Sequence, residues 1–295
     1  MNINKLLQIL QIQSASYDQF RIFARIIRDI KQIPECRYYV KEGNIYVTKG
    51  NASGYPSVVA HMDTVHDIAD DLTAVTIGRN ITGFNKATMQ QTGIGGDDKV
   101  GIFITLECLR LFDTIKVAFF RDEETGCEGS YEADLSFFTD CNFVLQCDRQ
   151  GYRDFIVEAG GVELSSAQFQ SSLKPLLDSF DYQAATGFMT DVMALKEIGV
   201  ECSVANISCG YFNPHTEYEF VNIDCVEHCQ NLVMSILHQF GTVKFPHLPE
   251  TRKTLTQIPK SGKLQIPLCP DCWANEVTTT GYCETCNEYY GLMLR

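Results

Sequence analysis

The chain has 295 residues, 45% of them hydrophobic, and a formal net charge of −13 at pH 7. No apolar run approaches the roughly 18 residues of a membrane-spanning helix, so we expect a globular protein with no membrane partner. Nucleic acid is not an expected partner either, because a phosphate-binding surface needs clustered Lys and Arg. The first residues lack a basic segment followed by an apolar one, and this favours a cytoplasmic location.

Thirteen cysteines are present, most of them single and in apolar segments. This distribution favours reduced thiols over disulfides. Nine of them are expected to be small core residues. These are Cys36, Cys108, Cys127, Cys141, Cys147, Cys202, Cys209, Cys225 and Cys229.

The first periodic segment, residues 17–33, predicts an amphipathic helix that covers a sheet. Ser16 is its expected N-cap, and Pro34 is its expected stop. The apolar positions at helical spacing are Phe20, Phe23, Ala24, Ile27 and Ile30.

Strands and helices then alternate along the chain. Strands are predicted over 36–40, 44–48, 56–60, 72–81, 115–120, 142–146 and 203–207, and helices over 99–112, 191–198 and 224–240. In the last helix, Asp224 and Glu227 have the spacing of a capping box. The alternation predicts an α/β fold with a doubly wound, mostly parallel, mixed sheet flanked by helices.

Potential metal ligands follow several of these strands directly. His61 comes after the strand 56–60, three acids that include Glu124 come after 115–120, and Asp148 comes after 142–146. Open α/β sheets place their ligands at the carboxyl ends of the strands. Asp97 follows a glycine-rich turn, and His215 lies further along. Each residue alone is a weak signal, but the five in this order predict a two-metal site.

With these blocks, residues 5–240 resemble the co-catalytic zinc exopeptidases, a group that includes tripeptidase T, the glutamyl and leucyl aminopeptidases, and related carboxypeptidases and deacylases. Tripeptidase T is the most similar type. The resemblance implies a phosphorylase/hydrolase-like fold. The matching blocks are His61-Met62-Asp63-Thr64-Val65, Gly95-Gly96-Asp97-Asp98-Lys99, Glu123-Glu124-Thr125-Gly126, Asp148, and Asn213-Pro214-His215-Thr216 with Glu219.

The resemblance implies that Asp97 bridges two catalytic zinc ions. His61 and Asp148 would complete one site, and Glu124 and His215 would complete the other. Carboxylate and imidazole are suitable zinc ligands, although manganese or cobalt can occupy similar carboxylate-rich sites. A water held between the two ions would have its pKa lowered towards neutrality.

Two residues beside the ligands have expected roles of their own. Glu123 is placed to take the proton of this water as general base and to return it to the leaving amine. Asp63 lies two residues from His61, on the same side of an extended strand, and can accept the second imidazole N–H. The resemblance also implies a cis peptide bond between Asp97 and Asp98.

The spacing between two ligands bears on the substrate. Positions 149–214, which separate Asp148 from His215, leave no room for the lid domain that carboxypeptidase-type and deacylase-type relatives insert there. Residues 154–251 contain no Arg that could clamp a substrate carboxylate. We therefore expect an aminopeptidase acting on short peptides. Two alternatives remain. One is an amidohydrolase, deacylase or carboxypeptidase of the same group, and the other is a non-catalytic interaction module. A homo-oligomer also stays open, since a partner subunit could supply an Arg.

Candidate substrate residues lie in two segments. Thr190 and Asp191 form a turn that either faces the substrate or caps the next helix. Asn213 belongs to the segment before His215 that either lines the specificity pocket or packs in the core.

The end of the chain predicts a separate module. We expect a catalytic domain over 1–242, a proline-rich linker over 243–267 and a zinc ribbon over 268–295. Two CxxC pairs can hold one structural zinc ion tetrahedrally, and a redox role for the pairs is the alternative. Acidic residues outnumber basic ones in this module, which disfavours nucleic acid. The four ligands are Cys269, Cys272, Cys283 and Cys286.

Overall fold

The computed structural model describes residues 1–69, 71–248, 282–283 and 288–289. The chain divides into two compact units, Met1–Glu250 and Thr251–Arg295. In the second unit, β15 (Tyr282–Cys283) pairs antiparallel with β16 (Glu288–Tyr289). Most of the predicted linker lies outside the described residues, as do the predicted ribbon ligands Cys269, Cys272 and Cys286.

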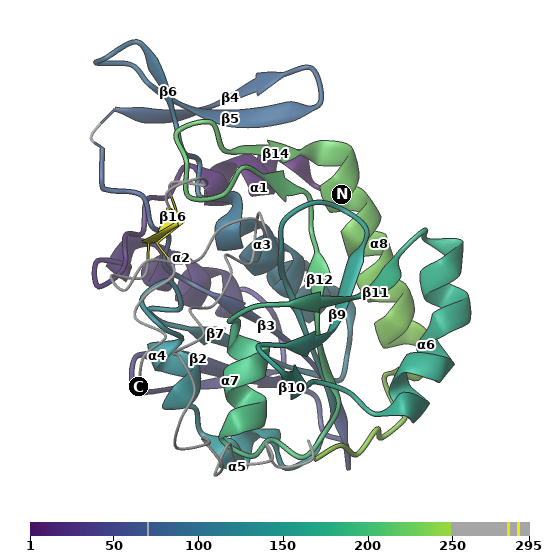
Figure 1. Ribbon diagram of the computed structural model, residues 1–295. Coiled ribbons are helices and arrows are strands. Elements are labelled where there is room, and N and C mark those ends of the chain that lie inside the picture. Colours follow the sequence, from purple (N-terminus) through teal and green to yellow (C-terminus); the bar gives the residue numbers. More distant parts are fainter. Residues whose placement is uncertain (70, 249–281, 284–287, 290–295) are drawn as a thin grey trace, which may run out of the picture. The chain divides into compact units, whose positions relative to one another are not determined.

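A nine-stranded mixed sheet forms the centre of the first unit (Figure 1). Its strand order is β1-β2-β7-β3-β8-β12-β9-β10, and β11 pairs with β9. The central run β7-β3-β8-β12 is parallel, whereas β1, β2 and β10 join antiparallel. The α/β class with a mixed sheet is therefore confirmed. The strands are β1 (Cys36–Lys41), β2 (Asn44–Lys49), β3 (Tyr55–His61), β7 (Ile115–Phe120), β8 (Cys141–Arg149), β9 (Asp154–Ala159), β10 (Val162–Glu163), β11 (Gln183–Gly187) and β12 (Val204–Ser208).

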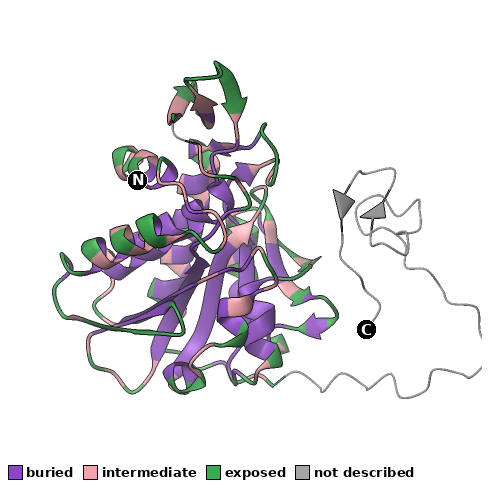
Figure 2. Ribbon diagram, turned by 90° about the vertical axis from the view of Figure 1, so that its left-hand side faces the viewer, coloured by how far each residue is buried: buried purple, intermediate pink, exposed green. Residues whose placement is uncertain are grey.

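Helices cover both faces of this sheet. On β3, Val58 and Ala60 join a core cluster with α1, α2, α3, α6 and α8, whereas Val59 joins a second cluster with α5 and α7. Neighbouring strand residues point to opposite faces, so the central strands are buried on both sides (Figure 2). None of the described helices is long and apolar enough to cross a membrane. The helices are α1 (Ile3–Leu10), α2 (Phe20–Ile30), α3 (Gly96–Leu111), α4 (Glu128–Tyr131), α5 (Leu135–Phe138), α6 (Ala167–Ser179), α7 (Asp191–Glu197) and α8 (Ile223–Phe240).

A smaller five-stranded sheet lies beside the main one, with the order β13-β14-β5-β4 and β6 paired to β5. The prediction of one strand over 72–81 is wrong, because the chain turns back at Gly78. This residue has a φ of +62°, which glycine adopts without steric cost. The strands are β4 (Leu72–Ile77), β5 (Asn80–Asn85), β6 (Gln90–Thr92), β13 (Tyr211–Phe212) and β14 (Phe220–Asn222).

Helix α2 packs through a stripe that overlaps the predicted one only in part. Ile22, Ile26 and Ile30 are buried, and of these only Ile30 belongs to the predicted stripe. Phe23 and Ile27 of that stripe pack against the core while partly buried, and Phe20 is 74% exposed. The three isoleucines recur every four residues and therefore share one side of the helix. Because α2 has apolar residues on more than one side, contacts with α1 and α3 decide which side is buried.

Two predicted helix caps also differ in the structure. Gln19, not Ser16, precedes α2, and the Ser16 hydroxyl bonds within the site described below. At α8, the cap is Asn222, whose side chain accepts the backbone N–H of Asp224. The Glu227 carboxylate binds the N-terminal ammonium group at 3.2 Å instead of closing a capping box.

The two sides of α2 predict different costs of truncation. Ile26→Ala should lower the free energy of unfolding by about 2–5 kcal/mol, because it leaves a cavity in the core. Phe20→Ala, the control on the exposed side, should change it by less than about 0.5 kcal/mol. Urea unfolding followed by circular dichroism measures both values. Equal losses would contradict the observed orientation of α2.

Candidate metal centre

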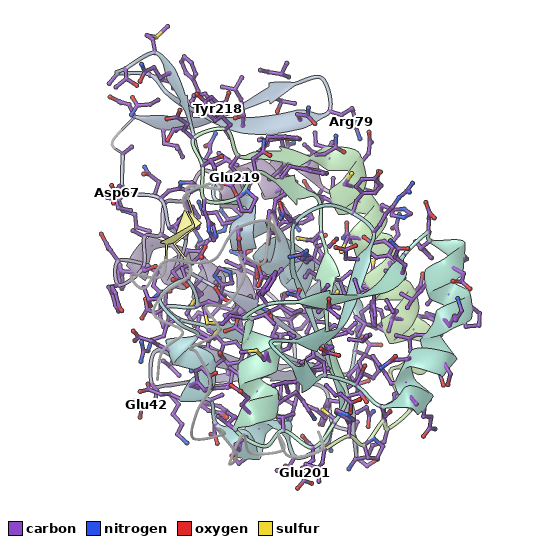
Figure 3. All side chains as sticks on the ribbon, in the orientation of Figure 1. Glu42, Asp67, Arg79, Glu201, Tyr218 and Glu219 are labelled. Carbon is purple, nitrogen blue, oxygen red and sulfur yellow. The ribbon has the colours of Figure 1, made fainter. Side chains whose placement is uncertain are left out.

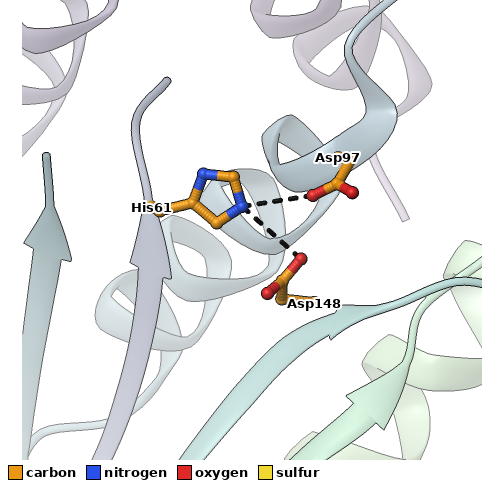
Figure 4. A group of neighbouring side chains, drawn as sticks. All are labelled: His61, Asp97 and Asp148. Atoms are coloured by element: carbon orange, nitrogen blue, oxygen red, sulfur yellow. Dashed lines mark hydrogen bonds and ion pairs between the residues drawn. The ribbon is translucent and has the colours of Figure 1, made fainter. Parts of the chain in front are cut away.

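Two groups of potential metal ligands lie at the carboxyl ends of the central strands. One consists of His61, Asp97 and Asp148 (Figure 4), and the other of Asp97, Glu124 and His215. Within each group the ligand atoms lie within 4.8 Å of one another. His61 is the last residue of β3, Asp148 is near the end of β8, and Asp97 is in the first turn of α3. The structure thus brings together the five side chains named from the sequence.

The Asp97 carboxylate faces both groups. Its Oδ1 lies 3.1 Å from His61 Nε2, which is also 3.5 Å from Asp148 Oδ1. Its Oδ2 lies 3.3 Å from His215 Nε2, which is 3.1 Å from Glu124 Oε2. One carboxylate with its oxygens turned towards different histidines has the arrangement of a bridging ligand between two ions.

Negative charge is concentrated in this buried region. Burial raises the pKa of Asp148 and of Glu124, and the nearby Asp97 raises both further. For Asp97, hydrogen bonds from His215 and His61 outweigh burial and hold its pKa well below the usual range. The site therefore needs positive charge, which protonated histidines or bound cations can supply.

A metal ion fits these residues on one further observation. Glu124 Oε1 is buried, and it has no hydrogen-bond partner among the residues that the structure describes. A buried carboxylate oxygen without a partner is costly, and a cation beside His215 and Asp97 would complete its environment. Imidazole and carboxylate oxygens are the donors that zinc binds in open, catalytic sites.

Asp63 connects the ligand His61 with the loop after β7. His61 Nδ1 bonds to the Asp63 backbone carbonyl oxygen at 3.1 Å and lies 3.3 Å from Asp63 Oδ1, which accepts the Glu123 backbone N–H at 2.9 Å. Asp63 Oδ2 accepts the Ser16 hydroxyl at 2.7 Å and the Glu124 backbone N–H at 3.3 Å. Asp63, which is fully buried, thus orients the imidazole through its backbone carbonyl and holds the segment that carries Glu123 and Glu124 through its carboxylate. Ser16, expected only as a helix cap, supports this arrangement.

Glu219 holds the backbone on the N-terminal side of Asp97. This buried carboxylate lies directly before β14, beside the small sheet (Figure 3). It accepts the N–H groups of Gly95 at 2.6 Å and Asp97 at 3.1 Å, and it lies 2.8 Å from His66 Nε2. The peptide bond between Asp97 and Asp98 is cis, as the resemblance implies.

A cavity of about 260 Å³ opens onto the two groups. Of the candidate substrate residues, Thr190 lines it, Asp191 is completely buried outside its lining, and Asn213 also lies outside its lining. Arg149 lines the cavity, so a basic group is available from outside the segment 154–251, which contains no Arg. The other lining residues include Gln150, Ile156, Phe188, Met189, Asn206 and Tyr211.

Solved structures of peptidases share this fold. Aminopeptidase PepT from Bacillus cereus gives a TM-score of 0.64 at 13% identity, covering 79% of this chain and 96% of that one. Aminopeptidase APDkam598 from the archaeon Desulfurococcus kamchatkensis gives 0.64 at 14%, covering 81% and 95%. Pyrococcus horikoshii TET1 peptidase, which can assemble into a tetrahedron or a large octahedral shell, gives 0.59 at 16%, covering 79% and 98%. The chain thus has the fold of the PepT and TET aminopeptidases.

Sequence comparison gives no corresponding match. No protein-family model matches the chain, and no curated protein matches it. At the identities above, the structural likeness establishes the fold and not the activity.

The shared position of Asp97 predicts a joint loss of metal. Asp97→Asn should remove bound zinc from both groups, because the amide cannot bridge two cations with two anionic oxygens. Mass spectrometry of the metal content after dialysis measures the effect. Asp178→Asn on α6 is the control, since in the described part of the chain its carboxylate pairs with Lys174 alone. Undiminished zinc in Asp97→Asn would contradict the bridging role.

Proposed function

We propose that the chain is a metal-dependent exopeptidase, and specifically an aminopeptidase that removes the N-terminal residue of short peptides. The observation that carries the proposal is the Asp97 carboxylate shared by two ligand groups, with the carboxylate of Glu123 beside them. A binding module has no need of such an additional acid. The fold shared with peptidases supports the same conclusion.

Two zinc ions are the proposed catalytic cofactors, and manganese or cobalt would suit the same carboxylate-rich donors. The ligands are His61, Asp97, Glu124, Asp148 and His215. When bound, the metal lowers the pKa of a water molecule towards neutrality and polarises the substrate carbonyl.

Glu123 is the proposed general base. Its Oε2 lies 3.9 Å from His61 Nε2, and the residue lines the cavity. Burial raises the pKa of Glu123, and the charges of Asp148 and Asp191 raise it further. A carboxylate in these surroundings has a high affinity for a proton. It takes one proton from the attacking water, and it gives this proton to the amine nitrogen as the C–N bond breaks.

Arg149 favours a second candidate function. It lines the same cavity, and its only described partner is Asp154, 3.5 Å from Nε. A guanidinium beside the reacting groups can bind a substrate carboxylate through paired N–H groups. This contact would suit a deacylase of N-acyl amino acids or a carboxypeptidase.

The remaining proposals concern the whole chain. We propose a catalytic domain over 1–242, a linker over 243–267 and, over 268–295, a ribbon that holds one structural zinc ion. A homo-oligomer is supported by the self-assembly of the TET1 peptidase. A short peptide is the proposed substrate, and the cytoplasm is the proposed location.

Hydrolysis by the zinc-loaded protein tests the proposed activity. Aminoacyl-anilides and di- and tripeptides should be cleaved, and N-acyl amino acids should not. Glu123→Gln should retain its metal and lose about 10²- to 10⁴-fold in kcat, because the amide cannot take a proton. Cleavage of N-acyl amino acids alone would select the second candidate. An inactive wild type with full metal content would overturn the enzymatic proposal.

The ribbon has its own test. Replacing Cys269 and Cys283 together by serine should lower the zinc content by about one ion per chain, because a closed four-thiolate site loses half its ligands. The paired control is Cys202→Ser with Cys225→Ser, which leaves both CxxC motifs intact. An unchanged zinc content in the ribbon variant would refute the structural site.

A further inference from the structure

Cys127 contacts the Glu123 carboxylate directly. Its Sγ lies 3.4 Å from Glu123 Oε1, and the residue is completely buried. Within the described part of the chain, this is the only hydrogen bond that the structure shows to that carboxylate. The sequence predicts a small core residue at position 127, and the burial of Cys127 agrees with that prediction. A core residue would not need a hydrogen bond to Glu123, so the contact suggests a second role for the thiol.

The local backbone fixes the thiol relative to the carboxylate. The Cys127 N–H donates to the Glu123 carbonyl oxygen at 2.8 Å, which closes the loop between the two residues. Cys127 has a left-handed φ of +57° directly before α4, and its own carbonyl accepts the Ser130 hydroxyl at 3.1 Å. Arg121 bonds to Glu128 at 2.9 Å and ties the start of α4 to the end of β7. The thiol therefore has a defined position.

Cys127 acts in this contact as a donor. Burial raises the pKa of its thiol, and the nearby Glu123 raises it further, so the sulfur keeps its proton. A carboxylate oxygen can only accept. Cys127 is not among the residues that line the cavity, so its thiol reaches the substrate region only through Glu123.

We propose that Cys127 is a positioning residue for the general base, an inference that rests on the proposed function. The S–H group holds Oε1, and this leaves Oε2 on the side of His61, 3.9 Å from its Nε2. A thiol is a weak donor, but within this buried loop its single bond to Oε1 is enough to fix the rotation of the carboxylate. Without the donor, the carboxylate rotates and fewer molecules are aligned for proton transfer.

Two substitutions separate positioning from core packing. Cys127→Ala removes the donor and keeps Cβ, whereas Cys127→Ser keeps a donor of similar size. With a peptide substrate, the alanine variant should lose about tenfold in kcat, the effect of losing one hydrogen bond to a charged group. KM and metal content should stay unchanged, and the serine variant should recover most of the rate.

Cys141→Ala is the matched control. It removes an equally buried thiol at the start of β8, seven residues or about 20 Å of strand from Asp148. Its kcat should equal that of the wild type. A Cys127→Ala variant with wild-type kcat, or a serine variant as slow as the alanine variant, would overturn the positioning role.

Infrared spectroscopy tests the contact independently of activity. The S–H stretching band of Cys127, identified by its loss in Cys127→Ser, should move to higher frequency in Glu123→Ala, because the acceptor is gone. If the wild type is active and the band does not move, the inference fails and the proposed function stands. If the band moves but the wild type cleaves no peptide or acyl amino acid, both the proposed function and the catalytic role of Cys127 are overturned.

Discussion

The sharing of one carboxylate between two histidines is the contact on which the site depends. Asp97 can present both oxygens only if its backbone and its neighbours are fixed. Glu219 accepts the backbone N–H of Asp97. On the C-terminal side of Asp97, Asp98 Oδ2 accepts the backbone N–H of His61 at 3.1 Å. Strand β3 and helix α3 are thereby joined where their ligands meet. The parallel strands β7 and β8 place Glu124 and Asp148, because their carboxyl ends lie at one edge of the sheet, whereas His215 comes from the segment between β13 and β14.

The surroundings of this contact are organised to hold negative charge. Asp63, Glu219 and Asp98 each accept backbone N–H groups, which satisfy their buried oxygens within the protein. Glu124 Oε1 lacks such a partner within the described ranges of the chain. Carboxylates that accept backbone N–H groups thus hold the backbone of the site in place, whereas a carboxylate oxygen without such a donor is free to bind a cation. Glu123, whose described hydrogen-bond donor is a thiol, belongs to neither set and remains able to exchange a proton.

Several of these features can be predicted from the sequence for a physical reason. Central strands buried on both faces read as continuous apolar runs, so the positions of His61 and Asp148 after such runs point to one edge of the sheet. Tertiary contacts explain the misses. The inward side of α2 is chosen by its neighbours, and α1 is too short for its periodicity to be distinctive. Arg149, which lines the cavity, is the last residue of β8, and this strand continues beyond the predicted end at 146.

The small sheet has a consequence for how the site is assembled. Glu219 bonds to Gly95 and Asp97 across 124 and 122 positions of the chain, and β14 pairs with β5 across a similar separation. Contacts this distant in sequence form late, because closing a long loop costs entropy before any pairing compensates it. During synthesis from the N-terminus, a chain that ends before Glu219 carries all five candidate ligands but lacks the carboxylate that holds Asp97. The geometry of the two ligand groups is therefore completed only after nearly all of the first unit has been made.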